Sequence, residues 1–297
     1  MKKFTLDYQQ IRKSPILDIA ARFWEPERYE AFRVCYASMR IIDDLVDDRK
    51  TQGVLSDAEK IEMTEVVKDW LKSLSTPSDK FRKQLLEVIK KFQIPLTPWQ
   101  LFGEAMIYDV NNDGFKNFKD YISYAEGAAV APASIFMHLC GVKKQDQGFI
   151  PPGFDIVEAA RPIALYAYLA HIIRDFQKDQ NDNLSFFADN LIAKSGLKKS
   201  QLKEIAEGSK IPLKFRSLMK IYLSYAENYR KKARKMIDKL SPHLQPEYRL
   251  SIEIIYTLYL QILERINVKK GSFTTKELNP TPQEIKERIR QTISAFS

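Results

Sequence analysis

Apolar residues recur every three or four positions through nearly the whole chain, and clusters of Pro, Gly, Asn, Ser or Thr separate the segments that carry them. This period is that of an amphipathic α-helix with one buried face. The pattern therefore predicts a bundle of about ten helices. Their predicted spans are 15–24, 26–48, 56–74, 79–92, 97–110, 117–140, 154–181, 211–239, 245–268 and 281–295.

Prolines mark both the starts and the weak points of these helices. Pro26, Pro98 and Pro282 stand at predicted starts, where the missing N–H removes no helical hydrogen bond. Pro132 and Pro162 fall inside predicted helices. Because an internal proline removes a hydrogen bond and crowds the preceding turn, each predicts a kink or a break.

The composition favours the same fold class. The chain has only 10 Gly in 297 residues, roughly half the usual share of about 7%, which leaves few turn residues for a fold of many strands. No repeat period and no linker rich in Gly, Pro or Ser divides the chain. We predict an all-α protein that forms a single domain over residues 1–297.

The chain carries no marks of secretion or of a membrane span. Cys35 and Cys140 lie far apart, so neither a disulfide framework nor a multi-cysteine metal site is expected. The first residues, MKKFTLDYQQIRKSP, lack the apolar run of a secretory signal. The longest weakly charged stretch, 162–173, is shorter than the roughly 20 residues that cross a bilayer. We expect a cytoplasmic protein.

Basic residues exceed acidic residues by 47 to 38, which gives a net charge of +9. Much of this excess falls in residues 198–239. Such a stretch is usually a solvated helix face, and the alternative is peripheral contact with anionic lipid headgroups. Nucleic-acid binding is not expected, because the basic residues spread over several helices without a recognised motif. The oligomeric state stays open.

Two acidic pairs carry the candidate chemistry. The first lies in CYASMRIIDDLVDD, where Asp43 and Asp47 are four residues apart and share a helix face. The second lies in AHIIRDFQKDQNDN, where Asp175 and Asp179 have the same spacing at the polar end of an apolar helix. An i,i+4 pair is offset by about 6 Å along the axis, so both carboxylates can approach divalent cations.

The residue types at these pairs indicate the kind of cation and ligand. Carboxylate oxygens without a Cys or His cage suit Mg²⁺, with Mn²⁺ as the alternative. Arg40 and Arg174 stand beside the two pairs, and guanidinium groups stabilise the charge of a departing diphosphate. One such pair alone would indicate an exposed helix face. Two pairs of equal spacing in apolar helices favour metal-dependent chemistry instead.

These motifs together resemble those of the squalene and phytoene synthases. That family's first signature, a tyrosine, a basic residue and D-x-x-x-D, resembles Tyr36, Arg40 and Asp43 to Asp47. Its second, N-I-L-R-D-x-x-x-D, is similar to residues 171–179 except at the first position. Two further residues match in place: Ser14, before a helix that closes over diphosphate in the family, and Tyr259, at the position of a pocket-lining tyrosine. The resemblance covers roughly residues 10 to 270.

The resemblance implies an all-α bundle around a deep apolar cavity with the acidic motifs at its mouth. It also implies that Mg²⁺ and basic residues draw diphosphate from an allylic prenyl substrate, leaving a carbocation that a second prenyl diphosphate attacks. The substrates would be of the farnesyl or geranylgeranyl class, and the product squalene- or phytoene-like or its cyclopropyl diphosphate precursor. Whether a reduction with NADPH follows stays open. The implied roles are metal binding by Asp43, Asp47, Asp175 and Asp179, diphosphate binding by Ser14, Arg40 and Arg174, and lining of the reacting centre by Tyr36 and Tyr259.

Three positions depart from the family pattern where substrate contact is implied. His171 stands in place of Asn, Tyr168 in place of Gln, and Glu126 in place of a tyrosine or a basic residue. These changes leave the metal ligands intact but leave chain length and product open. His171 has two readings of similar weight: a hydrogen bond that orients Asp175, or a core histidine with a backbone partner.

The same residues also allow other interpretations. Residues 109–114 and Asp120 match part of a calcium loop, but without the usual final Glu, so a polar turn with Asp109 at the cavity rim is the better interpretation. DDLVD also fits the D-D-x-x-D pattern of terpene cyclases and head-to-tail synthases, although the second motif favours the head-to-head group. A non-catalytic assembly or binding protein is the third hypothesis. Such relatives tend to lose acids that are all present here.

Overall fold

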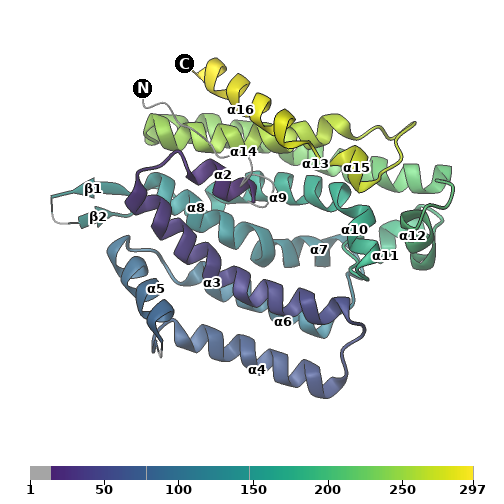
Figure 1. Cartoon of the computed structure of the whole chain (residues 1–297), viewed down its shortest axis with the longest axis horizontal. Coiled ribbons are helices and arrows are strands. Elements are labelled where there is room, and N and C mark those ends of the chain that lie inside the picture. The colour runs from purple at the N-terminus through teal and green to yellow at the C-terminus, as the bar shows by residue number, and fades with distance from the viewer. Residues whose placement is uncertain (1–14, 78, 147, 297) are drawn as a thin grey trace.

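The computed structural model describes residues 15–77, 79–146 and 148–296. Within these ranges the chain is a bundle of helices, and its one sheet is a two-stranded hairpin (Figure 1). The prediction of an all-α fold is therefore confirmed. Ser14, which the sequence assigns to diphosphate binding, lies outside the described residues.

The long helices of the first half are α3 (Pro26–Thr51), α4 (Asp57–Ser73), α5 (Lys80–Lys91) and α6 (Thr97–Asn111), preceded by the short α2 (Ile16–Ala21). They are followed by α7 (Phe118–Ala125), the π-helical turn η1 (Glu126–Val130), α8 (Ala131–Gly141) and the hairpin of β1 (Lys143–Gln145) and β2 (Gly148–Ile150). The second half contains α9 (Ile156–Arg174), α10 (Phe176–Asn181), α11 (Asp189–Lys194), α12 (Lys199–Ala206), α13 (Leu213–Leu240), η2 (Ser241–His243), α14 (Pro246–Arg265), α15 (Thr275–Leu278) and α16 (Pro282–Phe296).

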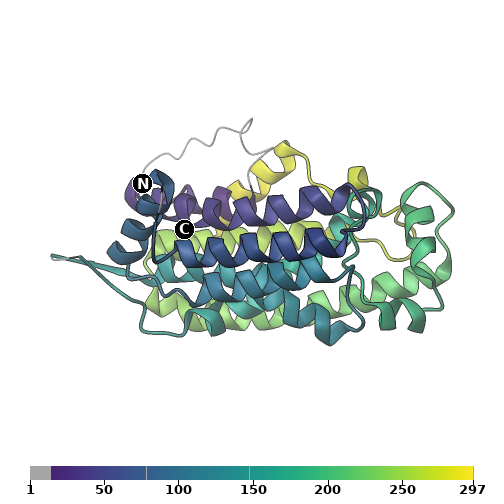
Figure 2. The same cartoon turned by 90° about the horizontal axis from the view of Figure 1, so that it is seen from below.

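Helix α9 is the central element of the bundle. It packs along α13 and against α8, α14 and η1. Figure 1 shows α13 and α14 on one side of this centre, with α3, α6 and α4 on the other. Figure 2 shows that the hairpin projects from one end of the bundle, while α11 and α12 lie at the opposite end. Most of the length of α9 is buried on all sides, which explains its nearly uniform apolar sequence.

The apolar character of α9 also satisfies the length and hydropathy expected of a membrane span. Among the described helices it is the one candidate, and 72% of its most apolar window is buried inside the bundle. Burial against neighbouring helices thus accounts for a composition that the sequence alone could assign to a bilayer.

The predicted helix over 117–140 contains a π-helical turn near Pro132. This residue lies in the first turn of α8, directly after the π-helical turn η1. Gly127 in η1 lies so close to α6 that a Cβ atom there would stand 2.2 Å from the carbonyl oxygen of Leu101 and 2.5 Å from Cβ of Ala105. A π-helical turn thus precedes Pro132, but the chain stays helical from α7 through α8, so no break occurs there, and a glycine allows the two backbones to approach.

The predicted helix over 154–181 is divided in two, but not at Pro162. Pro162 lies inside α9 without breaking it, so of the kink or break predicted there, the break is wrong. The helix instead ends at Asp175, which caps α9 and leads directly into α10. Packing of α9 against several neighbours stabilises it more than one missing hydrogen bond destabilises it.

Several short elements were not predicted. Helices α11, α12 and α15 and the hairpin of β1 and β2 span between three and eight residues each. So short a segment carries less than about two turns of the apolar period, too few to distinguish a helix from a loop. None of these elements contributes to the cavity described next.

Candidate active site

A hollow of about 330 Å³, here called the cavity, lies between α3, α6, α8, α9 and α14. Apart from its acidic end, its walls are mostly apolar or aromatic, and they include Phe102, Tyr124, Phe136, Met137 and Ile163. The central apolar cavity expected from the sequence is therefore present. Apolar walls with polar groups at one end are typical of small-molecule sites.

The two predicted acidic pairs meet at one end of this cavity, here called the acidic mouth. Asp43 and Asp47 reach it from α3, and Asp175 and Asp179 reach it from the junction of α9 and α10. The backbone N–H of Asp179 donates to the carbonyl oxygen of Asp175 at 2.8 Å, which keeps helical spacing across the junction. Residues 132 positions apart in sequence thus share one site.

Asp175 is held by two basic neighbours. Arg174 donates from Nε to Oδ1 and from Nη2 to Oδ2, both at 2.7 Å, and Nε2 of His171 lies 2.6 Å from Oδ2. Burial alone would raise the pKa of Asp175, but these contacts outweigh it and hold the pKa well below its usual range. His171 is 42% exposed and contacts a carboxylate, so the alternative of a core histidine is wrong.

Asp43 has one basic partner, which it shares. The Arg40 guanidinium donates to Asp43 and to Asp44, the next residue along α3. Burial raises the pKa of Asp43 to about 6 in spite of this contact. Asp43 therefore shares its arginine with a neighbour, whereas Asp175 receives two hydrogen bonds from Arg174.

Asp47 and Asp179 have no hydrogen-bond or ion-pair partner for their carboxylates among the described residues. Burial raises the pKa of Asp47 to about 7, and the charge of Asp43 adds to this shift. Burial likewise raises the pKa of Asp179 to about 8, with contributions from Asp175 and, across the mouth, from Asp47. The site is thus short of positive charge, which a bound cation would supply.

The donor set at the acidic mouth fits a hard cation such as Mg²⁺. All four side chains offer carboxylate oxygens, the ligands that this ion prefers. Within the described residues no three Asp, Glu, His or Cys side chains converge on a single point. A cation here would therefore complete its shell with water or with oxygens of a bound ligand, as Mg²⁺ commonly does at phosphate sites.

Two tyrosines named from the sequence lie where the cavity opens. Tyr36 on α3 and Tyr259 on α14 both line it, and burial raises the pKa of each phenol. Tyr168 also lines the cavity, where its ring stacks on Tyr121 with centroids 5.7 Å apart. All these phenols stay protonated near neutral pH.

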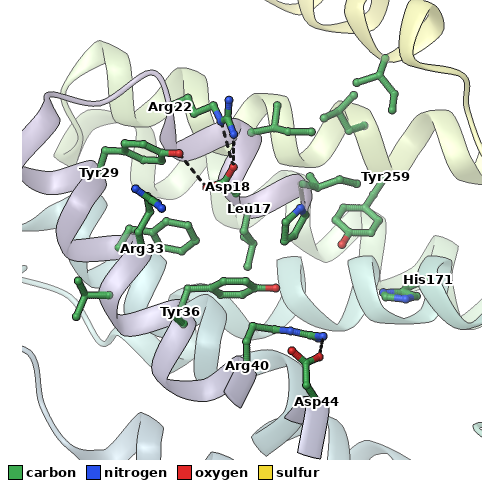
Figure 3. Close-up of a pocket in the computed structure, with 18 of the residues that line it drawn as sticks. Leu17, Asp18, Arg22, Tyr29, Arg33, Tyr36, Arg40, Asp44, His171 and Tyr259 are labelled. Carbon is green, nitrogen blue, oxygen red and sulfur yellow. Dashed lines mark hydrogen bonds and ion pairs between the residues drawn. The ribbon is translucent and has the colours of Figure 1, made fainter. Parts of the chain in front are cut away.

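A second and wider hollow of about 1730 Å³, here called the groove, adjoins the cavity between α2, α3, α14 and the chain around α16. Figure 3 shows Tyr36, Tyr259 and His171 around it, with Arg40 extending from α3 to Asp44. Tyr36, Arg40, His171, Tyr259 and Leu17 line both hollows, so the two meet at these side chains. Arg174 also faces the groove.

Glu126 does not join the site, contrary to its assignment to substrate binding. It lines neither hollow and pairs instead with Arg161 at 3.1 Å, on the outside of η1. The π-helical turn changes the angular spacing of successive side chains, so that Ala128 and Ala129 face the cavity in its place. Glu126 was assigned from the resemblance, which matches positions along the chain and not side-chain directions.

Asp109 lies on α6 behind the acidic mouth, and not on the cavity wall. Nζ of Lys50 donates to its carboxylate at 2.7 Å and to the carbonyl oxygens of Asp109 and Asn112 at 3.0 and 3.2 Å. This pair joins the end of α3 to the end of α6. Because Asp109 is helical and neutralised by Lys50, the calcium-loop interpretation fails.

Two residues of the site were not recognised in the sequence. Tyr124, on α7, lies on the cavity wall and belongs to no motif. Lys178, between the two acids of the second pair, lines the cavity and binds Asp182 at 3.1 Å. Its position next to Asp179 was the available signal for Lys178, whereas Tyr124 gave none.

Comparison with known proteins gives a consistent result. A chloroplastic phytoene synthase from Narcissus pseudonarcissus is 24% identical over 251 residues, which cover 84% of this chain and 56% of that protein. The chain therefore spans about half the length of this curated relative.

Solved structures share the fold. A dehydrosqualene synthase with a bound ligand matches at a TM-score of 0.74 and 16% identity, over 97% of this chain and 94% of that one. A squalene synthase from Alicyclobacillus acidocaldarius matches at a TM-score of 0.65 and 12% identity, over 87% and 92%. A family model described as squalene/phytoene synthase matches residues 15–284. The chain therefore belongs to the squalene/phytoene synthase family.

Proposed function

We propose that this chain is a prenyltransferase that joins two prenyl diphosphates of the farnesyl or geranylgeranyl class head to head and releases diphosphate. The observation that carries the proposal is a mostly apolar cavity whose mouth holds Asp43, Asp47, Asp175 and Asp179. An apolar chain fits the walls and a charged diphosphate fits the mouth. Family membership supports the same reaction.

Diphosphate departure is the step for which the acidic mouth is suited. Mg²⁺ held by the aspartates would neutralise the charge that grows on the leaving group. Arg40 and Arg174 face the groove, where their guanidinium groups can bind diphosphate oxygens in a bidentate manner. The leaving group would thus depart toward the groove and away from the apolar wall.

The cavity walls suit the carbocation that remains. Phe136 and Tyr124 line the cavity, and aromatic rings can stabilise positive charge without forming a bond to it. Tyr36 and Tyr259 carry neutral phenols, which are weak nucleophiles. Prenyl chains that fill this mostly apolar cavity would also exclude water, which would trap the cation.

The double bond of a second prenyl diphosphate would then attack the cation, and loss of one proton from the new cation would close the ring of a cyclopropyl diphosphate. We place the two reacting ends near Tyr36, Tyr259 and His171, where the cavity and the groove meet. Tyr168 and His171, which differ from the family pattern, lie on this path. They are therefore the side chains to vary when the product is altered.

The direct test is incubation of the purified chain with farnesyl or geranylgeranyl diphosphate and Mg²⁺, with and without NADPH, followed by mass spectrometry. The proposal expects a product with twice the prenyl carbon number or its cyclopropyl diphosphate. A cyclised product from a single prenyl chain, or a head-to-tail product, would instead favour the second enzyme hypothesis. Absence of any turnover would favour a binding role.

We also propose that the protein is cytoplasmic and touches a membrane peripherally, since its substrates would be lipophilic. Leu213, at the start of α13, is 82% exposed and stands between the exposed Lys210 and Lys214. An apolar tip flanked by lysines suits an anionic bilayer surface.

A further inference from the structure

Basic groups already occupy half of the acidic mouth. Both carboxylate oxygens of Asp175 accept hydrogen bonds from Arg174 at 2.7 Å, and His171 lies 2.6 Å from one of them. Asp43 accepts from Arg40. In this arrangement Asp43 and Asp175 are neutralised by the chain itself, so a cation must compete with a guanidinium group for each of them.

No basic group of the described chain pairs with the other two acids of the acidic mouth: Lys178 lines the cavity but binds Asp182, and Lys50 binds Asp109. Asp47 and Asp179 line the cavity, and neither carboxylate has a hydrogen bond or an ion pair with a described residue. Asp179 is only 9% exposed. An unpartnered buried carboxylate that faces a cavity is costly, and this cost falls when a ligand of opposite charge binds.

The two arginines have a second place to bind. Arg40 and Arg174 both line the groove, through which a diphosphate can reach the acidic mouth. A guanidinium group binds phosphate oxygens bidentately, as it binds a carboxylate. A diphosphate carries more charge than a single carboxylate, so it competes well for both arginines.

We propose that Arg40 and Arg174 act as a latch on Asp43 and Asp175, so that the first cation binds between Asp47 and Asp179, and that diphosphate opens the latch by drawing both arginines to itself. This inference rests on the proposed function, because it assigns an order of binding to the same site. Asp43 and Asp175 then become available to further cations only together with diphosphate. Without substrate, the protein therefore binds only the first cation, and the rest of the metal site stays blocked by the two arginines.

Binding of Mn²⁺, followed by electron paramagnetic resonance with and without inorganic pyrophosphate, tests the latch on the full chain. Without pyrophosphate, Asp47→Asn and Asp179→Asn should each weaken Mn²⁺ binding by about tenfold or more, whereas Asp43→Asn should leave it nearly unchanged. With pyrophosphate, Asp43→Asn should lose bound Mn²⁺ as well. These substitutions preserve side-chain shape, and circular dichroism melting checks that each variant folds.

The arginine variants give effects of opposite sign. Arg174→Gln and Arg40→Gln should increase Mn²⁺ binding without pyrophosphate, because a competing cation is removed, and should weaken pyrophosphate binding in calorimetry. Arg161→Gln, which removes an arginine that lines neither hollow, is the matched control and should change neither quantity. A purely structural role of the arginines would not produce opposite changes in the two affinities.

Two results would overturn the latch, and they differ in what else they reject. Equal loss of Mn²⁺ binding in Asp43→Asn and Asp47→Asn without pyrophosphate would show that all four carboxylates are open from the start. That result rejects the latch and leaves the proposed function intact. If the unmodified protein binds no Mn²⁺ even with pyrophosphate, the proposed metal chemistry and the latch both fail.

Discussion

Lys50 and Asp109 form an ion pair of 2.7 Å between the ends of α3 and α6, and their side chains are only 12% and 10% exposed. The pair lies directly behind the acidic mouth, and the charge of Asp109 contributes to the raised pKa of both Asp43 and Asp47. It therefore connects the packing of two helices with the electrostatics of the candidate site.

Removal of one partner of this pair should destabilise the protein. Lys50→Met leaves the Asp109 carboxylate buried without its partner, and we expect a loss of about 2–4 kcal/mol in the free energy of unfolding. Urea denaturation measures this loss. The double variant Lys50→Met with Asp109→Leu should lose less than Lys50→Met alone, and an equal or larger loss would contradict the assignment of the effect to an unpaired charge.

Neutralisation of Asp47 or Asp179 should lower activity without lowering stability. Asp47→Asn and Asp179→Asn should each lower product formation by more than about 100-fold, because a proposed metal ligand is lost. Neither should lower the melting temperature of the metal-free protein, because each removes a buried charge without a partner. A variant that melts earlier and keeps its turnover would contradict both expectations.

Because η1 lies so close to α6, a methyl group added at Gly127 should strongly destabilise the fold. Gly127→Ala would place a Cβ atom 2.2 Å from the carbonyl oxygen of Leu101, where backbone and not a flexible side chain must move. We expect a loss of about 2–3 kcal/mol in the free energy of unfolding. Gly153→Ala is the matched control, because a Cβ at that position meets nothing within 4 Å. Equal stability of the two variants would argue against this packing.

His138 predicts a pH dependence of stability with a definite sign. Burial lowers its pKa from 6.5, and Nε2 lies 2.8 Å from the carbonyl oxygen of Phe92. The unfolded chain therefore binds a proton at His138 more readily, so this group stabilises the fold above about pH 6.5 and loses that contribution as the pH falls through its folded pKa. Burial raises the pKa of the unpartnered aspartates, which act in the opposite sense.

The comparison that isolates His138 is His138→Gln, which keeps a hydrogen-bond donor for Phe92. Chemical denaturation at pH 7.5 and pH 5 should show the unmodified protein losing stability relative to the variant as the pH falls. If the stability difference between the two proteins is the same at both pH values, the His138 ring does not stay neutral in the fold.

The proposed membrane contact predicts binding that depends on lipid charge. Co-sedimentation with vesicles should be stronger for anionic phosphatidylglycerol than for phosphatidylcholine, and should weaken with salt. Lys210→Gln with Lys214→Gln should reduce it. Lys83→Gln with Lys90→Gln, two lysines of α5, is the control and should not. Equal binding by both double variants would indicate attraction by net charge alone.

Most of what the sequence predicts about the site follows from the spacing of residues within single helices. Asp43 and Asp47 had to share a face once residues 26–48 were read as a helix, and the second pair followed in the same way. Glu126, which was assigned from the resemblance, failed because its side chain pairs with Arg161 at a π-helical turn that no local pattern predicted. The position of Tyr124 on the cavity wall depends on contacts between distant helices, which no local period encodes.

The same limit applies to how the charges are paired. The sequence shows that Arg174 is next to Asp175. It does not show that Arg174 binds both carboxylate oxygens of Asp175, or that the carboxylate of Asp179 has no partner among the described residues. That difference between the two acids depends on side-chain direction at the α9 to α10 junction.

The central claim is that carboxylates from α3 and from the α9 to α10 junction together hold cations that bind a prenyl diphosphate. Crystals grown with Mn²⁺ and an unreactive prenyl thiodiphosphate, measured at the manganese absorption edge, test it most directly. The account predicts anomalous peaks between Asp47 and Asp179, with the diphosphate beside them and the prenyl chain in the cavity. Anomalous peaks elsewhere, or a prenyl chain outside the cavity, would contradict it.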